Sequence, residues 1–339
     1  NGFVHHLAQS VKEGKVSEAD IDTACRRILE AKYKLGLFAD PYRYCNTKRS
    51  KAEIYTADNR KVARDVAAET FVLLKNDNHF LPLKKEGKIA LIGPLADTRN
   101  NIAGTWSVAQ APSKYTTIKE AMENALKGKA TLLYAQGSNI WRNQQLQKNG
   151  EFDKPLSWGD EKQMKAEALK IAKEADVIVC AMGESADMTG ECGTRTNLEM
   201  PDVQHELLAE LVKLGKPVVL LNFAGRPTVL SWEKQNVPAI MNVWFGGSEM
   251  GDALCDVLFG DKVPSGKLTT SMPKVTGQEP LYYNHLNTGR PVPDDNAHFA
   301  KYASNALDVS NGPLYPFGYG LSYTTFEYSN FKLSSDKAS

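Results

Sequence analysis

The sequence predicts an α/β fold: a mostly parallel sheet sandwiched between helices on both faces, with a helical N-terminal extension and a C-terminal β stub. Short runs that are apolar throughout recur between residues 88 and 244, as is typical of parallel strands buried on both faces. Segments with helical periodicity alternate with these runs. The 339 residues are 42% hydrophobic and 24% charged, as in ordinary globular proteins with room for more than one domain.

The first 41 residues are predicted to be helical. Ser17 is a candidate N-cap with acidic residues in the following turn, and Gly36 is expected to end that helix. The apolar stripe of this helix comprises Ile21, Ala24, Ile28, Leu29 and Ala31. Residues 42–56 are polar and predict a linker. Since the chain opens inside a helical pattern, without an initiator Met or a signal peptide, we expect a fragment or a processed chain.

A second domain is predicted over residues 57–273, where strands and helices alternate. It opens with an amphipathic helix at 58–70, followed by an apolar run at 71–76. Strands are predicted at 88–93, 130–134, 176–181, 217–222 and 238–244. Further helices are predicted at 117–126, 160–173, 202–214 and 248–259. Residues 267–271 are expected to form an edge strand after a Pro-Ser-Gly turn.

The C-terminal part has a different character. Residues 274–318 are rich in Pro, Gly, Asn, Tyr and Asp and have no sustained periodicity. That length is unusual for a simple connection, so we predict a structured, functional loop. Residues 324–333 alternate like the first strand of a β-domain, which defines the stub at 319–339.

Composition and residue spacing exclude several functions. With 41 basic and 40 acidic side chains and no basic run interleaved with aromatics, no electrostatic nucleic-acid site is expected. No apolar run approaches the ~20 residues of a membrane-spanning helix. The histidines form no ligand cluster, and no Cys-x-x-Cys pair occurs, so neither a metal nor a cofactor is predicted. The scattered cysteines are Cys25, Cys45, Cys180, Cys192 and Cys255.

Two glycine-containing segments are candidates for phosphate-binding loops. Residues 245–251 follow a strand and open a helix, but they lack the Gly-x-Gly-x-x-Gly spacing, and Glu249 would repel a phosphate. Residues 260–267 are one residue too long for a P-loop and precede a strand instead of following one. Close packing of helix and strand is the favoured interpretation of the first segment.

The segment 182–201 is the most informative part of the chain. Glu184, Asp187 and Glu191 follow the predicted strand at 176–181 and precede a helix. Ligands of open α/β sheets bind outside the carboxyl ends of the strands. Three carboxylates at this position therefore indicate acid/base chemistry, with a loop cap as the alternative for Asp187.

Trp106 lies in a glycine-containing loop after the first strand of the alternation. A loop tryptophan either covers the hydrophobic core or presents its ring face to a ligand such as a sugar. The residues alone leave both interpretations open.

Several long segments resemble glycoside hydrolase family 3, in the family's order: 62–76, 81–83, 89–97, 256–261, 264–268, 282–291 and 315–326. Residues 1–41 are similar to the last helices of the family's N-terminal barrel. Residues 319–339 are similar to the start of its fibronectin-III-like domain. The resemblance covers essentially the whole chain.

The resemblance implies a retaining exo-β-glycosidase of the β-glucosidase type, which hydrolyses terminal non-reducing β-D-glucosyl units with two carboxylates. The acid/base position falls on Glu191, with Glu184 as the alternative. Trp106 matches a subsite aromatic, and Arg195 is a candidate substrate-binding residue that steers the carboxylate, unless it is an ordinary surface arginine. The family's nucleophile lies in a Ser-Asp-Trp/Tyr motif of the barrel, which this chain lacks. We therefore expect the chain alone to be inactive.

The implied partners are a β-linked oligosaccharide or glucoside and the barrel domain of the same protein, with no nucleic acid and no membrane span. Exposed apolar surface makes a homo-oligomer a further expectation. The parent is expected in the bacterial periplasm or outside the cell. The rival hypothesis is a non-catalytic carbohydrate-binding or scaffold module. A nucleotide-binding domain rests on fold analogy alone.

Overall fold

The computed structural model describes residues 2–108, 110–294 and 299–335. The chain divides into two compact units, residues 1–59 and 60–339. The finer domain limits inferred from the sequence remain predictions.

The first unit is helical. Its helices are α1 (Gly2–Lys12), α2 (Glu18–Lys34), α3 (Arg49–Glu53) and the first residues of α4 (Ala57–Thr70). Ser17 is confirmed as the N-cap of α2, since its hydroxyl accepts the Asp20 N–H at 3.1 Å. Gly36 follows the end of α2 with a φ of +71°. Most of the apolar stripe of α2 is exposed (Ile28 is 61% exposed), although Ile21 is partly buried. Helix α3 lies in the segment predicted as a linker.

The second unit is built on a six-stranded sheet with the order β1-β6-β5-β4-β2-β3. Its strands are β1 (Val72–Asn76), β2 (Lys88–Ile92), β3 (Thr131–Ala135), β4 (Val177–Gly183), β5 (Val218–Phe223) and β6 (Ala239–Asn242). All pairs are parallel except β1 with β6. The predicted mostly parallel sheet is confirmed.

The predicted edge strand at 267–271 is wrong. The edge beside β6 is occupied by β1, the apolar run that follows α4. Leu268 instead exchanges backbone hydrogen bonds with Gly318 and Tyr319, and Met272 forms an isolated bridge with Tyr315. These residues pair with a later part of the chain, and the outer side of β1 is met by Leu321, which forms an isolated bridge with Leu73.

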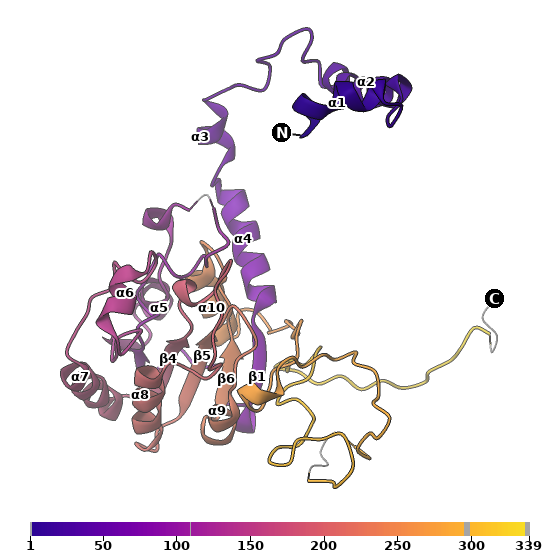
Figure 1. The fold of residues 1–339 in the computed structure, drawn as a ribbon. Coiled ribbons are helices and arrows are strands. Elements are labelled where there is room, and N and C mark those ends of the chain that lie inside the picture. The colour runs from indigo at the N-terminus through magenta and orange to yellow at the C-terminus, as the bar shows by residue number, and fades with distance from the viewer. Residues whose placement is uncertain (1, 109, 295–298, 336–339) are drawn as a thin grey trace. The chain divides into compact units, whose positions relative to one another are not determined.

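Helices cover both faces of the sheet (Figure 1). Side chains of α4, α5 (Ile118–Leu126) and α10 (Met250–Leu258) pack into one core with alternate strand residues such as Val179 and Ala181. Side chains of α7 (Glu161–Glu174) and α8 (Asp202–Val212) pack into the other core with Ile178 and Cys180. The short α6 (Gln144–Asn149) and α9 (Ser231–Asn236) complete the unit. Burial on both faces explains why the strands are apolar throughout.

The chain order creates a topological switch point between β2 and β4. After β2 the chain adds β3 on one side, then crosses to place β4 on the other side of β2. The loops that leave the carboxyl ends of β2 and β4 are therefore followed by helices on opposite faces of the sheet, and such a point is where open α/β sheets bind ligands. Gly183 ends β4 with a φ of +127°, and a Cβ there would lie 2.2 Å from the Phe223 carbonyl oxygen. Only glycine allows so close an approach.

The long loop 274–318 is ordered by side-chain amides over its described residues. The Gln278 side chain donates to the carbonyls of Ser310, Asn311 and Gly312. Residues 324–333 form no strand, in contrast to the sequence prediction, because no segment among the described residues pairs with them. Residues 295–298 and 336–339, which belong to the predicted loop and stub, lie outside the described part of the chain.

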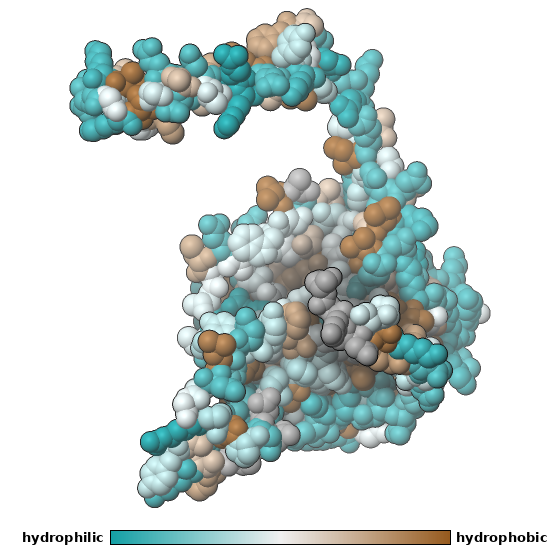
Figure 2. Space-filling model, turned by 90° about the vertical axis from the view of Figure 1, so that its right-hand side faces the viewer, coloured by the Kyte–Doolittle hydropathy of each residue, from teal (hydrophilic) through white to brown (hydrophobic). Residues whose placement is uncertain are grey.

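Exposed apolar side chains lie in separate patches on the face shown in Figure 2. The exposed apolar side chains of the second unit, over all of its faces, include Trp106, Val108, Tyr282, Tyr283, Leu286, Phe299, Tyr302, Phe326 and Phe331. A homo-oligomer stays a prediction. Over the described residues, none of the helices has the length and apolar character needed to span a membrane.

Candidate active site

The acidic loop, residues 184–201, leaves the carboxyl end of β4 at the switch point. At its tip the N–H of Gly193 donates to the Gly190 carbonyl at 3.3 Å and closes a tight turn. Gly190 and Cys192 both have positive φ values, +131° and +59°. Glu191 lies at the corner of this turn and is exposed. The turn therefore presents the Glu191 carboxylate to solvent.

The tryptophan loop, residues 93–117, leaves β2 and lies against the acidic loop. A Cβ on Gly190 would meet the Thr105 side chain at 3.0 Å, so the backbone of the acidic loop packs closely against that side chain. The buried Asn101 side chain joins the two loops again, since its Oδ1 accepts the Ala186 N–H at 2.8 Å. Trp106 follows Thr105 and is 71% exposed. The structure thus brings together the two loops that carry the acid/base and aromatic candidates.

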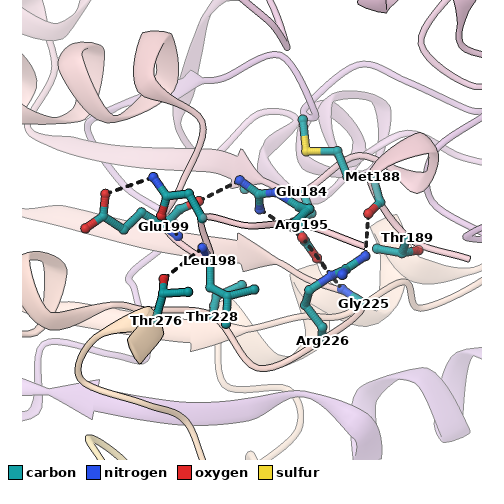
Figure 3. A network of polar contacts seen from close by, with 12 residues as sticks. Glu184, Met188, Thr189, Arg195, Leu198, Glu199, Gly225, Arg226, Thr228 and Thr276 are labelled. Atoms are coloured by element: carbon teal, nitrogen blue, oxygen red, sulfur yellow. Dashed lines mark hydrogen bonds and ion pairs between the residues drawn. The ribbon is translucent and has the colours of Figure 1, made fainter. Parts of the chain in front are cut away.

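Glu184, by contrast, is buried at the base of the acidic loop (Figure 3). Its Oε1 accepts a hydrogen bond from Arg195 Nη1 at 2.9 Å and lies 3.1 Å from Arg226 Nε. Its Oε2 accepts the Gly225 N–H at 3.0 Å. The residue is 1% exposed, so its carboxylate has no open face toward a substrate.

Both arginines also bind the backbone of the acidic loop. Arg195 Nη2 donates to the Glu199 carbonyl at 2.9 Å, and Arg226 donates to the Met188 carbonyl. The arginine side chains are only 15% and 18% exposed. Arg195, a candidate for substrate binding, thus points to Glu184 instead of lying on the surface.

Asp187 caps a neighbouring segment, as the loop-cap alternative proposed. Its carboxylate accepts the backbone N–H groups of residues 151, 152 and 153 at 2.7–3.0 Å. Asp153 is itself fully buried, and its Oδ2 accepts hydrogen bonds from Ser185 Oγ at 2.7 Å and from Trp141 Nε1 at 3.1 Å. These contacts fasten the segment around residue 153 to the acidic loop.

Burial raises the pKa of Asp153 to about 6, and the nearby charge of Asp187 adds to the effect, while hydrogen bonds from Ser185 and Trp141 oppose it. The pKa of Asp153 is higher in the folded than in the unfolded state, so folding favours the protonated carboxyl. The contribution of this carboxyl to the unfolding free energy is complete below the unfolded pKa. It is lost as the pH rises through the folded pKa. A shift of about two pKa units corresponds to roughly 3 kcal/mol.

We therefore expect Asp153→Asn, which keeps an acceptor for Ser185, to remove this pH dependence. Relative to the wild type, the variant should gain roughly 3 kcal/mol of unfolding free energy between about pH 4 and pH 7. Denaturant titrations followed by tryptophan fluorescence measure the difference, with the exposed Glu151→Gln as the matched control. An equal pH dependence of both variants would contradict the assignment.

No metal centre is formed by the described residues: nowhere in ranges 2–108, 110–294 and 299–335 do three His, Cys, Asp or Glu side chains gather as ligands. The exposed groups of these two loops include the Glu191 carboxylate and the Trp106 ring. They suit proton transfer and recognition of a neutral, polyhydroxylated ligand.

Residues 71–323 match the family model of the glycosyl hydrolase family 3 C-terminal domain. The chain belongs to glycoside hydrolase family 3. It is 45% identical over 98% of its length to a periplasmic beta-glucosidase of Salmonella typhimurium, and 35% identical over 93% to a beta-xylosidase of Formosa agariphila. It is also similar to the crystal structure of a beta-glucosidase from Listeria innocua in complex with isofagomine, with a TM-score of 0.80 and 36% identity over 96% of this chain.

The chain spans 44% and 40% of the lengths of the two curated relatives and 42% of the Listeria innocua structure. The fold prediction and the family are confirmed. The activity of a longer protein, its substrate and its partners belong to the proposal below.

Sequence reasoning did not single out Arg226 or Asp153. Arg226 follows Gly225 at the carboxyl end of β5, and that polar turn after an apolar strand was the available signal. For Asp153 no local signal exists, because its burial depends on Trp141 and Ser185, which come from other segments.

Proposed function

We propose that this chain is part of a retaining exo-β-glycosidase of the β-glucosidase type, in which Glu191 is the acid/base residue. One observation carries the proposal: of the two glutamates considered for this role, Glu191 is exposed at a turn beside the tryptophan loop, whereas Glu184 is buried and engaged on both oxygens. A residue that transfers a proton to a glycosidic oxygen must reach that oxygen, and the Glu191 carboxylate is open to such contact.

In a retaining mechanism a second carboxylate, which lies about 5–5.5 Å from the acid/base carboxyl group, attacks the anomeric carbon. The acid/base residue protonates the leaving oxygen, and it then deprotonates the water that hydrolyses the glycosyl-enzyme. We propose that the nucleophile is an aspartate of a barrel domain in the parent protein, since the relatives are more than twice as long as this chain. Trp106 is proposed to stack on a sugar ring, because its side chain is exposed next to the acidic loop.

We propose a terminal β-D-glucosyl unit as the substrate group, with a β-xylosyl unit as the alternative. The first is supported by the name of the relative at 45% identity and the second by the name of the relative at 35%. A periplasmic or secreted location of the parent is proposed on the same Salmonella typhimurium relative.

The test compares the full-length parent with the 339-residue chain on aryl β-glucosides and β-xylosides. The parent should release the aglycone, and proton NMR should show the β-anomer of the sugar as the first product. The chain alone should be inactive. An α-anomeric first product, or turnover by the chain alone at the parent's rate, would refute the proposal, and an inactive parent would favour the non-catalytic carbohydrate-binding module.

A further inference from the structure

We propose that Glu184, Arg195 and Arg226 form a positioning clamp that sets where the acidic loop presents Glu191. The clamp arginines are positioning residues: they act through the loop and do not touch the substrate. This inference rests on the proposed acid/base role of Glu191.

The tip of the loop depends on its ends for its position. Residues 190–194 make one hydrogen bond among themselves, from Gly193 to Gly190, and none to the rest of the described chain. Close contact with Thr105 supports the tip from one side. The orientation of Glu191 is therefore decided by the segments that precede and follow the tip.

The clamp fixes both of these segments through one carboxylate. Before the tip, Arg226 binds the Met188 carbonyl; after it, Arg195 binds the Glu199 carbonyl at 2.9 Å. Both guanidinium groups then meet at Oε1 of Glu184, at 2.9 and 3.1 Å. Figure 3 shows this convergence at the base of the loop. The ends of the loop are thus tied to each other and, through Arg226 and Gly225, to the segment after β5.

The chemistry of the clamp favours rigidity. A guanidinium group is a planar fork with donors in fixed directions, and Arg195 uses it to hydrogen-bond the Glu184 carboxylate and the Glu199 carbonyl at once. Arg226 hydrogen-bonds the Met188 carbonyl and pairs with the same carboxylate through its charge. A lysine ammonium lacks this geometry. Because proton transfer requires close alignment, a displacement of about 1 Å can lower a rate by roughly 100-fold.

The test uses Arg195→Met and Arg226→Met in the full-length parent, with Arg142→Met as the matched control. Like the clamp arginines, Arg142 forms ion pairs with carboxylates, but it lies at the surface and pairs with three of them, Glu161, Asp202 and Glu206. Clamp variants should lose about 10- to 100-fold in kcat/KM on glucosides with poor leaving groups, as expected for misplaced acid catalysis. A dinitrophenyl glucoside, whose leaving group departs without a proton, should be hydrolysed with nearly wild-type kcat/KM. The control should behave as the wild type on both substrates.

An equal loss on both substrates would overturn the clamp, because it would indicate a general structural defect. Full activity of Arg195→Met on the poor substrate would also overturn it, because the loop would then not need Arg195. Should a methionine variant fail to fold, Arg195→Lys replaces it, since it keeps the charge but not the fork. Azide separates the two proposals. It should rescue Glu191→Ala but not Arg195→Met, in which the acid/base carboxylate is present. Wild-type activity of Glu191→Ala would refute the proposed role of Glu191. If azide rescues Glu191→Ala but the clamp variants keep wild-type kcat/KM, the clamp alone is refuted.

Discussion

Glu191→Gln in the full-length parent is expected to lower kcat/KM by about 100- to 10,000-fold on glucosides with poor leaving groups. The amide has no proton to give the departing oxygen and cannot activate water. On a dinitrophenyl glucoside kcat/KM should change little, because that leaving group needs no protonation. Since Glu191 is exposed and makes no hydrogen bond with its side chain among the described residues, the stability of the protein should be unaffected.

Glu199→Gln provides the matched control, as an exposed glutamate of the same loop whose side chain accepts a hydrogen bond from Asn197. Steady-state kinetics of both variants on a series of aryl glucosides measure the effect. Azide should restore turnover to Glu191→Ala and yield a glycosyl azide. Unchanged kinetics of Glu191→Gln on the poorest leaving group would remove it from the acid/base role.

Glu184→Gln should lower the unfolding free energy of the second unit by about 3–5 kcal/mol, because it leaves two largely buried guanidinium groups without their carboxylate. Gln also carries a donor group where Glu184 only accepts. Tryptophan fluorescence during denaturation measures this unit selectively, since all five tryptophans lie between residues 106 and 244.

Glu206→Gln is the comparison for an exposed ion pair. Glu206 accepts from Arg142 at 2.7 Å but is half exposed, so its loss should cost no more than about 1 kcal/mol. Similar costs for the two variants would mean that Glu184 contributes no more than a surface pair. Together with the first prediction, this separates the two glutamates: Glu191 acts on turnover without affecting stability, whereas Glu184 contributes to stability and acts on turnover only through the position of the loop.

The fold was largely predictable because its signals are local. Each strand from β2 to β6 is an apolar run bounded by polar turns. Helices begin at polar N-cap residues, as α7 does at Asp160. The failures occurred where pairing depends on distant residues. Residues 267–271 have strand composition, but Leu268 pairs with Gly318 and Tyr319, and Leu321 lies against the outer side of β1. Residues 324–333 alternate correctly but have no partner strand among the described residues.

The site was predictable only as a list of candidates. By itself the sequence determined the family, the mostly parallel sheet and the acidic loop at a strand end, because periodicity and long motifs are properties of consecutive residues. It left Glu184 and Glu191 as alternatives, since two carboxylates in one loop are chemically alike in sequence. The tertiary structure decided their environments. The strand order places the tryptophan loop beside Gly190, and Arg226, in the segment after β5, pairs with the buried Glu184. Burial and ion pairing arise from residues far apart in the chain, and only the folded structure brings them together.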